Sequence, residues 1–489
     1  MEKQKSIKKN IVMSTILTVS NFVFPLITYA YVARVLTPVG TGKVAFVTSI
    51  LQYFIYMATM GLPTYGIREC ARVRDDREEL SRVVQELLII SLISTAAAYF
   101  VLTCCVAFIP KLHEYRKLFL VMGIYIGLNT IGVEWMYKGL EEYSYITARS
   151  ILFKCIAVAL TFICIHTPDD YLWYGFISVF ALSASYVCNF LRAHRYVSLK
   201  KTGSYNLKRH MKPIFTMLAA TVCIVIYSNF DVSMLGFIST ENEVGLYNSA
   251  YKIKSIILSL STAITSVMIP RMAYYIKHES HDEAYSLCTD SARISLLLAV
   301  PVAVYCFAFA KDVILFLCGE QYIDAAATMR ILLVCVLPLI ATDLFGQQIL
   351  IPSGREDLYS KSAMAGVVVN IVCNLLLIPR LGAAGAALGT LVTALIIMLV
   401  LAGGCGEYIK NSLGKIKYPE YIGALICGTL AGTGVSLLVG EINVFLRLAF
   451  TAIAFFAVYY GIMLAFKEPV LTEEITKLLS HIKRKKENG

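Results

Sequence analysis

Fourteen stretches of mostly apolar residues run along this chain of 489 residues, and they decide what it can fold into. A helix crosses a bilayer with roughly 20 apolar residues, so stretches of this length would place about 60% of the chain in lipid. The composition agrees, because 57% of the residues are apolar and 16% are charged, against about 45–50% and about 25% in soluble domains. The sequence therefore predicts an all-α polytopic membrane protein with about 14 transmembrane helices. It excludes a soluble enzyme, a disordered chain and a secreted disulfide scaffold.

The predicted helices occupy residues 11–33, 44–65, 83–109, 118–137, 149–166, 172–191, 213–238, 251–275, 293–318, 328–352, 361–379, 385–406, 420–440 and 446–466. The first stretch follows several lysines, as in a signal peptide, but it is too long for the apolar region of one. We interpret it as a membrane helix. The 14 Cys lie without any CxxC spacing, so we predict packing residues and no metal site.

The basic residues predict the orientation. With the N-terminus in the cytoplasm, the inner segments and their helix ends hold 32 Lys and Arg, and the outer ones hold 11. Inner loops of membrane proteins carry such an excess, so both termini are predicted to be cytoplasmic. The net charge of +11 then reflects topology and attraction to anionic membrane lipids. Because basic runs are ordinary in inner loops, we predict no nucleic-acid partner.

An internal repeat predicts the domain organisation. A shift of 203 residues places Thr37-Pro-Val-Gly-Thr-Gly42 on Thr240-Glu-Asn-Glu-Val-Gly245, and a shift of 215 places Gly139-Leu-Glu-Glu142 on Gly354-Arg-Glu-Asp357. Each matched segment follows the equivalent helix of its half. We predict two pseudo-symmetric six-helix lobes, 1–205 and 206–410, related by a two-fold axis along the membrane normal, as in several secondary transporters. Residues 411–489 would add two helices and a basic cytoplasmic tail.

Four of the predicted helices carry polar residues on one face at helical spacing. In the first, second, seventh and eighth helices these stripes are Ser14, Thr18, Asn21, Pro25 and Thr28; Ser49, Gln52, Tyr56, Thr59 and Pro63; Met217, Thr221, Ile224, Ser228 and Asp231; and Lys252, Ser255, Ser259, Thr262 and Ser266. Two interpretations remain open. Ser and Thr serve as small packing residues between helices, or the four repeat-related stripes line a shared aqueous cavity, which we favour.

Ionisable residues inside the predicted helices are the other signal of function. Each costs about 2.5–3.5 kcal/mol at mid-bilayer, so such residues usually face a cavity or a partner. They are Arg34, Asp231, Lys252, Glu134, Lys154, Arg271 and Asp343. Arg34, Arg271 and Lys252 could instead extend to the interface, and Glu134 could pair with Lys138. We hypothesise that Lys154, helped by Arg34 and Arg271, engages an anionic substrate group, while Asp231 and Asp343 pair with cations at a gate or carry a coupling ion.

Several segments resemble the polysaccharide-biosynthesis flippases, the O-antigen or Wzx-type branch of the multidrug/oligosaccharidyl-lipid/polysaccharide (MOP) superfamily. They are Val133-Glu-Trp-Met-Tyr-Lys-Gly-Leu-Glu-Glu142, Arg149-Ser-Ile-Leu-Phe-Lys154, Asp231-Val-Ser-Met-Leu-Gly236, Val244-Gly-Leu-Tyr-Asn-Ser-Ala-Tyr-Lys252 and Leu381-Gly-Ala-Ala-Gly-Ala-Ala387.

The resemblance implies two lobes that alternate between inward-open and outward-open states in a bacterial cytoplasmic membrane. It implies a cationic cavity and an undecaprenyl-diphosphate-linked oligosaccharide as cargo, with Lys154 and Arg34 at positions that match the family's diphosphate-facing cations. A glycan polymerase and glycosyltransferases of the same pathway would be partners.

No phosphate-binding GxxxxGK[ST] motif occurs in the sequence, so we expect no cofactor and a proton or sodium gradient as the energy source. A multidrug or metabolite antiporter of the same superfamily is the main alternative. A membrane-embedded glycan polymerase is a further alternative, although the predicted outer loops of about ten residues leave little room for catalytic residues. We therefore expect a transporter and not an enzyme.

Overall fold

The computed structural model describes residues 7–198, 200–440, 442–473 and 476, and these residues are helical with short connections. Eleven described helical stretches are long and apolar enough to cross a membrane. Two of them, Val12–Arg72 and Glu356–Gly404, each contain two of the predicted helices, and Lys208–Ile238 matches a further one. The chain is therefore an all-α polytopic membrane protein with about 14 transmembrane helices, as predicted.

The chain forms two compact units, Met1–Asn248 and Ser249–Gly489. Helices of the first unit are α1 (Ile7–Thr59), α2 (Leu62–Arg72), α3 (Arg77–Phe108), α4 (Pro110–Glu114), α5 (Arg116–Ile131), α6 (Glu134–Gly139), α7 (Tyr143–Cys164), the 3₁₀ helix η1 (Pro168–Asp170), α8 (Tyr171–Ala193) and α9 (Lys208–Ile238). Contacts thus group α9 with the first unit. The predicted lobe boundary at 205 rests on sequence symmetry and not on contacts, and it stays a prediction.

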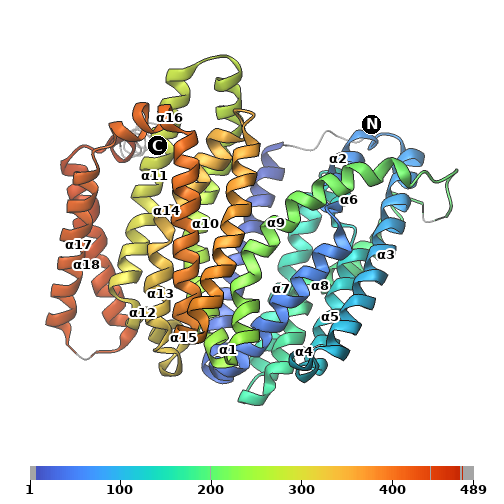
Figure 1. Cartoon of the computed structure of the whole chain (residues 1–489), viewed down its shortest axis with the longest axis horizontal. Helices are drawn as coiled ribbons and strands as arrows, with labels where there is room; N and C mark the ends of the chain where they lie inside the picture. The colour runs from blue at the N-terminus through green and yellow to red at the C-terminus, as the bar shows by residue number, and fades with distance from the viewer. Residues whose placement is uncertain (1–6, 199, 441, 474–475, 477–489) are drawn as a thin grey trace, which may run out of the picture. The chain divides into compact units, whose positions relative to one another are not determined.

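The division between the units falls inside α10 (Glu241–Lys277). The remaining elements are α11 (His281–Ala308), α12 (Ala310–Cys318), η2 (Glu320–Tyr322), α13 (Ala325–Val334), α14 (Val336–Asp343), the π-helix η3 (Leu344–Leu350), α15 (Glu356–Gly404), α16 (Gly406–Asn411), η4 (Leu413–Lys415), α17 (Tyr418–Val439) and α18 (Val444–Ala465). Within the second unit α17 and α18 lie side by side (Figure 1). The Tyr305 hydroxyl links α11 to α18 by donating to Leu448 O at 2.8 Å.

Two long helices contain sharp bends. In α1 the backbone of Thr37 has φ 61° and ψ 172°, which separates the first predicted transmembrane helix from the second. In α15 the same role falls to Gly382, with φ 54°. Each of these predicted pairs of helices is therefore joined by a bend and not by a loop.

Helix α2 is amphipathic and closes one end of the first unit beside α6 (Figure 1). Its Leu62, Tyr65 and Cys70 are buried, and Gly66 lies so close to the ring of Trp135 that a β-carbon there would be 2.6 Å from it. Asp76 precedes α3 as its N-cap, and its carboxylate accepts from the amides of Glu78 and Glu79. These contacts fix the helices around the polar groups described next.

Candidate substrate site

Lys154 is buried in α7, where 6% of the residue is exposed. Its ammonium donates to Ser20 Oγ at 2.8 Å and to Asn21 Oδ1 at 2.5 Å, both on α1. Among the described residues no carboxylate oxygen lies within 4.0 Å of it. The ammonium is thus held by neutral oxygens alone. Since Asn21 is exposed, the charge lies one side chain beneath the surface of the unit.

Glu134 on α6 forms a second polar group with two cations. Its carboxylate pairs with Lys138 Nζ at 2.8 Å and with Arg149 Nη2 at 3.2 Å. The first pair is the one that the sequence suggested. Arg149 is 5% exposed at its side chain and also donates to Asn189 Oδ1, while Asn189 Nδ2 donates to Gly132 O at 2.8 Å. Arg149 therefore joins α6, α7 and α8.

A cavity of about 200 Å³ lies against this network. Its wall is mixed: charged, amide, hydroxyl and aromatic groups come from Thr59, Ser91, Asn129, Thr130, Glu134, Trp135, Lys138 and Tyr186, and aliphatic groups come from Leu62, Pro63 and Ile67. A space of this size with polar groups on its wall has room for several waters. The interior of the first unit is therefore polar around Glu134 and not a dry apolar core.

The other predicted cations are not gathered at Lys154. Arg34 is exposed and lies on the same helix as Asn21, thirteen residues further along, which corresponds to roughly 20 Å of helix. Arg271 is exposed on α10, and Lys252 is half-buried on the same helix. Both belong to the second unit. Direct help from Arg34 at the Lys154 ammonium is therefore not part of this conformation.

Asp343 is brought together with another predicted residue of its unit. The Thr262 hydroxyl lies 3.3 Å from Asp343 Oδ2, and Gln347 Nε2 donates to Oδ1 at 3.2 Å. Asp343 closes α14 at the point where the π-helix begins, and π segments inside helices are frequent at functional sites. Ser259 is half-buried, and its hydroxyl donates to Ile256 O of its own helix at 2.6 Å.

The stripes of hydroxyl groups are satisfied mainly by their own helices. Thr18 is exposed and donates to Ser14 O at 2.9 Å, and Thr262 also donates to Leu258 O at 3.1 Å. A hydroxyl can make such a bond to its own helix whether it faces lipid, protein or water. The shared cavity therefore stays a prediction. Of the seventh-helix stripe, the side chains of Met217, Thr221, Ile224 and Ser228 lie outside the described residues.

Asp231, the last residue of that stripe, is buried and accepts from the Tyr247 hydroxyl at 2.7 Å. Two residues further along, the Ser233 hydroxyl donates to Ser49 Oγ at 3.0 Å and lies 3.2 Å from Tyr53 Oη. Gln52, next to Tyr53, is half-buried. These bonds join the second half of α1 to the end of α9.

The segments that matched as repeats lie against each other within the first unit. A β-carbon on Gly42 would be 1.9 Å from Glu241 O, and one on Gly245 would be 2.0 Å from Pro38 O. Glu241 also pairs with Lys111 Nζ at 3.3 Å and accepts from the Tyr115 hydroxyl. Burial raises the pKa of Tyr115, as does Glu241, so the phenol stays a donor. We call Gly42, Gly245, Glu241, Lys111 and Tyr115 the glycine contact.

Tyr56 lines a larger, apolar cavity of about 670 Å³ between α1, α3 and α9. Its walls are mostly aliphatic side chains and methionines, including Met57, Met60, Ile90 and Met211. Tyr56 therefore borders an apolar space.

Arg149, Asn189 and Glu86 are not among the predicted site residues. Arg149 is the first residue of the predicted helix 149–166. The observed helix α7 begins at Tyr143, so Arg149 lies nearly two turns inside it. Glu86 lies within the predicted helix 83–109 and is fully buried. The cost of charges in membrane helices could have identified it by the reasoning that selected Lys154.

Comparison with known proteins identifies the family of this chain. A family model described as "Polysaccharide biosynthesis protein" matches residues 7–276, and a second, MatE, matches residues 217–376. The chain belongs to the polysaccharide biosynthesis protein family. This confirms the predicted branch of the MOP superfamily.

Relatives and solved structures agree with this assignment. A "Putative O-antigen transporter" of Escherichia coli (strain K12) is 24% identical over 408 residues, which cover 81% of this chain and 97% of the relative. "Probable low-salt glycan biosynthesis flippase Agl15" of Haloferax volcanii is 23% identical over 48% of this chain and 50% of its own.

Two solved structures share the fold. "Lipid II flippase MurJ, inward closed conformation" has a TM-score of 0.70 at 14% identity and covers 94% of this chain and 100% of its own. An "Inward-facing conformation of a multidrug resistance MATE family transporter of the MOP superfamily" has a TM-score of 0.58 at 17% identity, over 82% and 99%.

Proposed function

We propose that this protein is a flippase that moves an undecaprenyl-diphosphate-linked oligosaccharide across the bacterial cytoplasmic membrane. The repeat unit would be that of O-antigen, a capsule or another surface polysaccharide. The observation that carries the proposal is the Lys154 ammonium, which is buried in a membrane helix and whose hydrogen bonds, within the part of the chain that the structure describes, go to neutral oxygens. A charge in this setting costs free energy that an anionic ligand offsets.

The diphosphate of such a lipid fits this ammonium. The exposed Asn21 amide is the outer of its two partners, and an incoming phosphate oxygen would replace Asn21 Oδ1. Because bonds between two ionised groups are stronger than bonds to a neutral amide, the exchange favours binding. The glycan would occupy an aqueous space while the polyprenyl chain remains in lipid.

Alternating access is the mechanism we propose, and the glycine contact is the part of the first unit that would have to separate. Backbone packing without β-carbons, together with one carboxylate bound by Lys111 and Tyr115, makes a contact that is close yet small.

Substituting Gly42 with Ala is expected to disrupt the glycine contact. The added methyl would lie 1.9 Å from Glu241 O, and overpacking of this kind costs about 1–3 kcal/mol. The closed conformation would lose that stability, so the thermal midpoint of the purified protein and its transport should both fall. A methyl added at Gly123 of α5 would have no atom within 4 Å, and an unchanged Gly123→Ala variant is the control. Normal transport by Gly42→Ala would exclude the contact from the cycle.

Coupling to an ion gradient is assigned to Asp343. Its carboxylate has the Thr262 hydroxyl and the Gln347 amide beside it, and oxygen-rich groups of this kind bind protons or sodium ions. Replacing Asp343 with Asn is expected to abolish the stimulation of transport by an imposed proton or sodium gradient, while gradient-free transfer persists. Asp343→Glu should keep the stimulation. A variant Asp343→Asn that still responds to both gradients would contradict the assignment.

The second candidate function is multidrug or metabolite export, and the MatE match over residues 217–376 favours it. A reconstituted assay separates the two. Proteoliposomes would carry either a fluorescent oligosaccharide on polyprenyl diphosphate, the same glycan on a polyprenyl alcohol, or a cationic dye. Transfer of the diphosphate lipid alone supports the flippase, whereas export of the dye alone would overturn it.

A further inference from the structure

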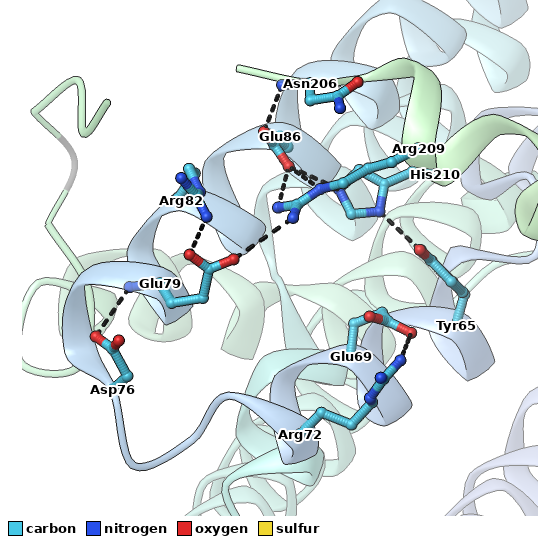
Figure 2. Close-up of polar contacts among 10 residues, drawn as sticks. All are labelled: Tyr65, Glu69, Arg72, Asp76, Glu79, Arg82, Glu86, Asn206, Arg209 and His210. Atoms are coloured by element: carbon cyan, nitrogen blue, oxygen red, sulfur yellow. Dashed lines mark hydrogen bonds and ion pairs between the residues drawn. The ribbon is translucent and has the colours of Figure 1, made fainter. Parts of the chain in front are cut away.

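A fully buried carboxylate on α3 holds the start of α9 (Figure 2). Glu86 accepts from the backbone amide of Asn206 at 2.7 Å, from Arg209 Nη2 at 2.6 Å and Nε at 3.0 Å, and from His210 Nε2 at 2.7 Å. A carboxylate offers about four acceptor positions, so its capacity is filled by one short segment of the chain.

The neighbouring Gln85 holds the segment between α8 and α9 in the same way. Its Nε2 donates to Ser198 O at 2.6 Å and to Lys200 O at 2.8 Å, and its Oε1 accepts from Thr202 N at 3.3 Å and from Tyr205 Oη at 2.8 Å. An amide side chain has two donors and two lone pairs. All four are used by the connecting segment.

His210 extends this cluster to α2. Its Nδ1 lies 2.7 Å from the Tyr65 hydroxyl, and both residues are buried. In the neutral ring, Nε2–H donates to Glu86 while Nδ1 accepts from Tyr65. Arg209 also reaches Glu79 at 3.5 Å. Helices α2 and α3 and the start of α9 are therefore joined by one continuous network.

We infer that Glu86 and Gln85 form an anchor that keeps the start of α9 fixed to α3 throughout the transport cycle. Opening it would break eight hydrogen bonds at once, four of them to a carboxylate, and bonds to a charged group are the stronger ones. The glycine contact has no comparable buried charge network among the described residues. The two contacts thus have opposite roles, one permanent and one that opens.

Hydrogen exchange on the full-length protein in lipid nanodiscs tests the anchor without any substrate. The amides of Thr202 and Asn206, which donate to Gln85 and Glu86, should exchange as slowly as the middle of α3. Glu86→Gln should accelerate them about tenfold or more, since a bond to a charged acceptor is lost. Glu78→Gln, an exposed change on the same helix, should leave them unchanged. If the Glu86→Gln protein fails to insert into the membrane, the same exchange measurement is made on Gln85→Ala. Unchanged exchange in both variants would overturn the anchor.

Crosslinking tests whether the anchor ever opens, and this arm rests on the proposed alternating access. Ser198 N lies 2.9 Å from Ser81 Oγ, so Ser81→Cys/Ser198→Cys can be joined by a short thiol reagent. The native side chains of Lys111 and Glu241 meet end to end, so Lys111→Cys/Glu241→Cys is joined across the glycine contact by a longer bifunctional thiol reagent. The single-Cys variants control for native cysteines. We expect the protein crosslinked at the anchor to keep wild-type transport. The crosslink across the glycine contact should abolish transport reversibly. Loss of transport on crosslinking the anchor would overturn the inference, whereas transport by both crosslinked proteins would overturn the alternating-access proposal alone.

Discussion

Replacing Lys154 with Met is expected to lower transport about tenfold to a hundredfold at a normal level of protein in the membrane. Met keeps the aliphatic volume in α7 but removes the ammonium that would hold the diphosphate, and a hydrogen bond to a charged group is worth about 1.5–3 kcal/mol. Transfer of the diphosphate lipid in proteoliposomes measures the loss. Lys154→Arg should retain most of the activity because the charge remains.

Variants of Asn21 distinguish a substrate site from a structural lysine. Asn21→Asp would place a carboxylate where the amide now accepts from Lys154, and the resulting ion pair would compete with the diphosphate. Transport should therefore fall although Lys154 is intact. Asn21→Ala should transport nearly normally, since Ser20 still holds the ammonium. If Asn21→Asp is as active as wild type, Lys154 is not the group that binds the substrate.

Replacing Arg149 with Met should produce the largest loss of stability, about 2–3 kcal/mol. The buried guanidinium donates to Glu134 and Asn189, and both would lose that donor. The change should lower the thermal midpoint of the protein in detergent by several degrees. Adding Glu134→Gln should recover part of the loss, because the remaining carboxylate would no longer be underpaired. A double variant less stable than the sum of the single ones would contradict this account.

The positions of the membrane helices could be predicted because apolar length is a local property of the sequence. The helices α7, α8, α17 and α18 begin and end within a few residues of the predictions, apart from the earlier start of α7 at Tyr143. The bend at Thr37 was not predictable, since Thr rarely adopts a positive φ.

The candidate site was predictable only in part. The cost of a charge in lipid selected Lys154, and the polar spacing of α1 selected Asn21, but their contact depends on how α7 packs on α1. The same cost applies to Glu86, which is fully buried and lies inside the predicted helix 83–109. Which cations lie close together depends on how the helices pack. Arg34 was predicted to act beside Lys154, but it lies away from the Lys154 ammonium in the structure.

The backbone of Thr37 has a further consequence for energetics. Its φ of 61° with ψ of 172° lies in a region that is essentially reserved for glycine, and a residue held there stores about 1–3 kcal/mol. The strained residue lies five positions before Gly42, at the junction that we expect to rearrange. The packing around Thr37 therefore has to offset this cost in the conformation described here, and a glycine at the same position would adopt the same backbone angles without it.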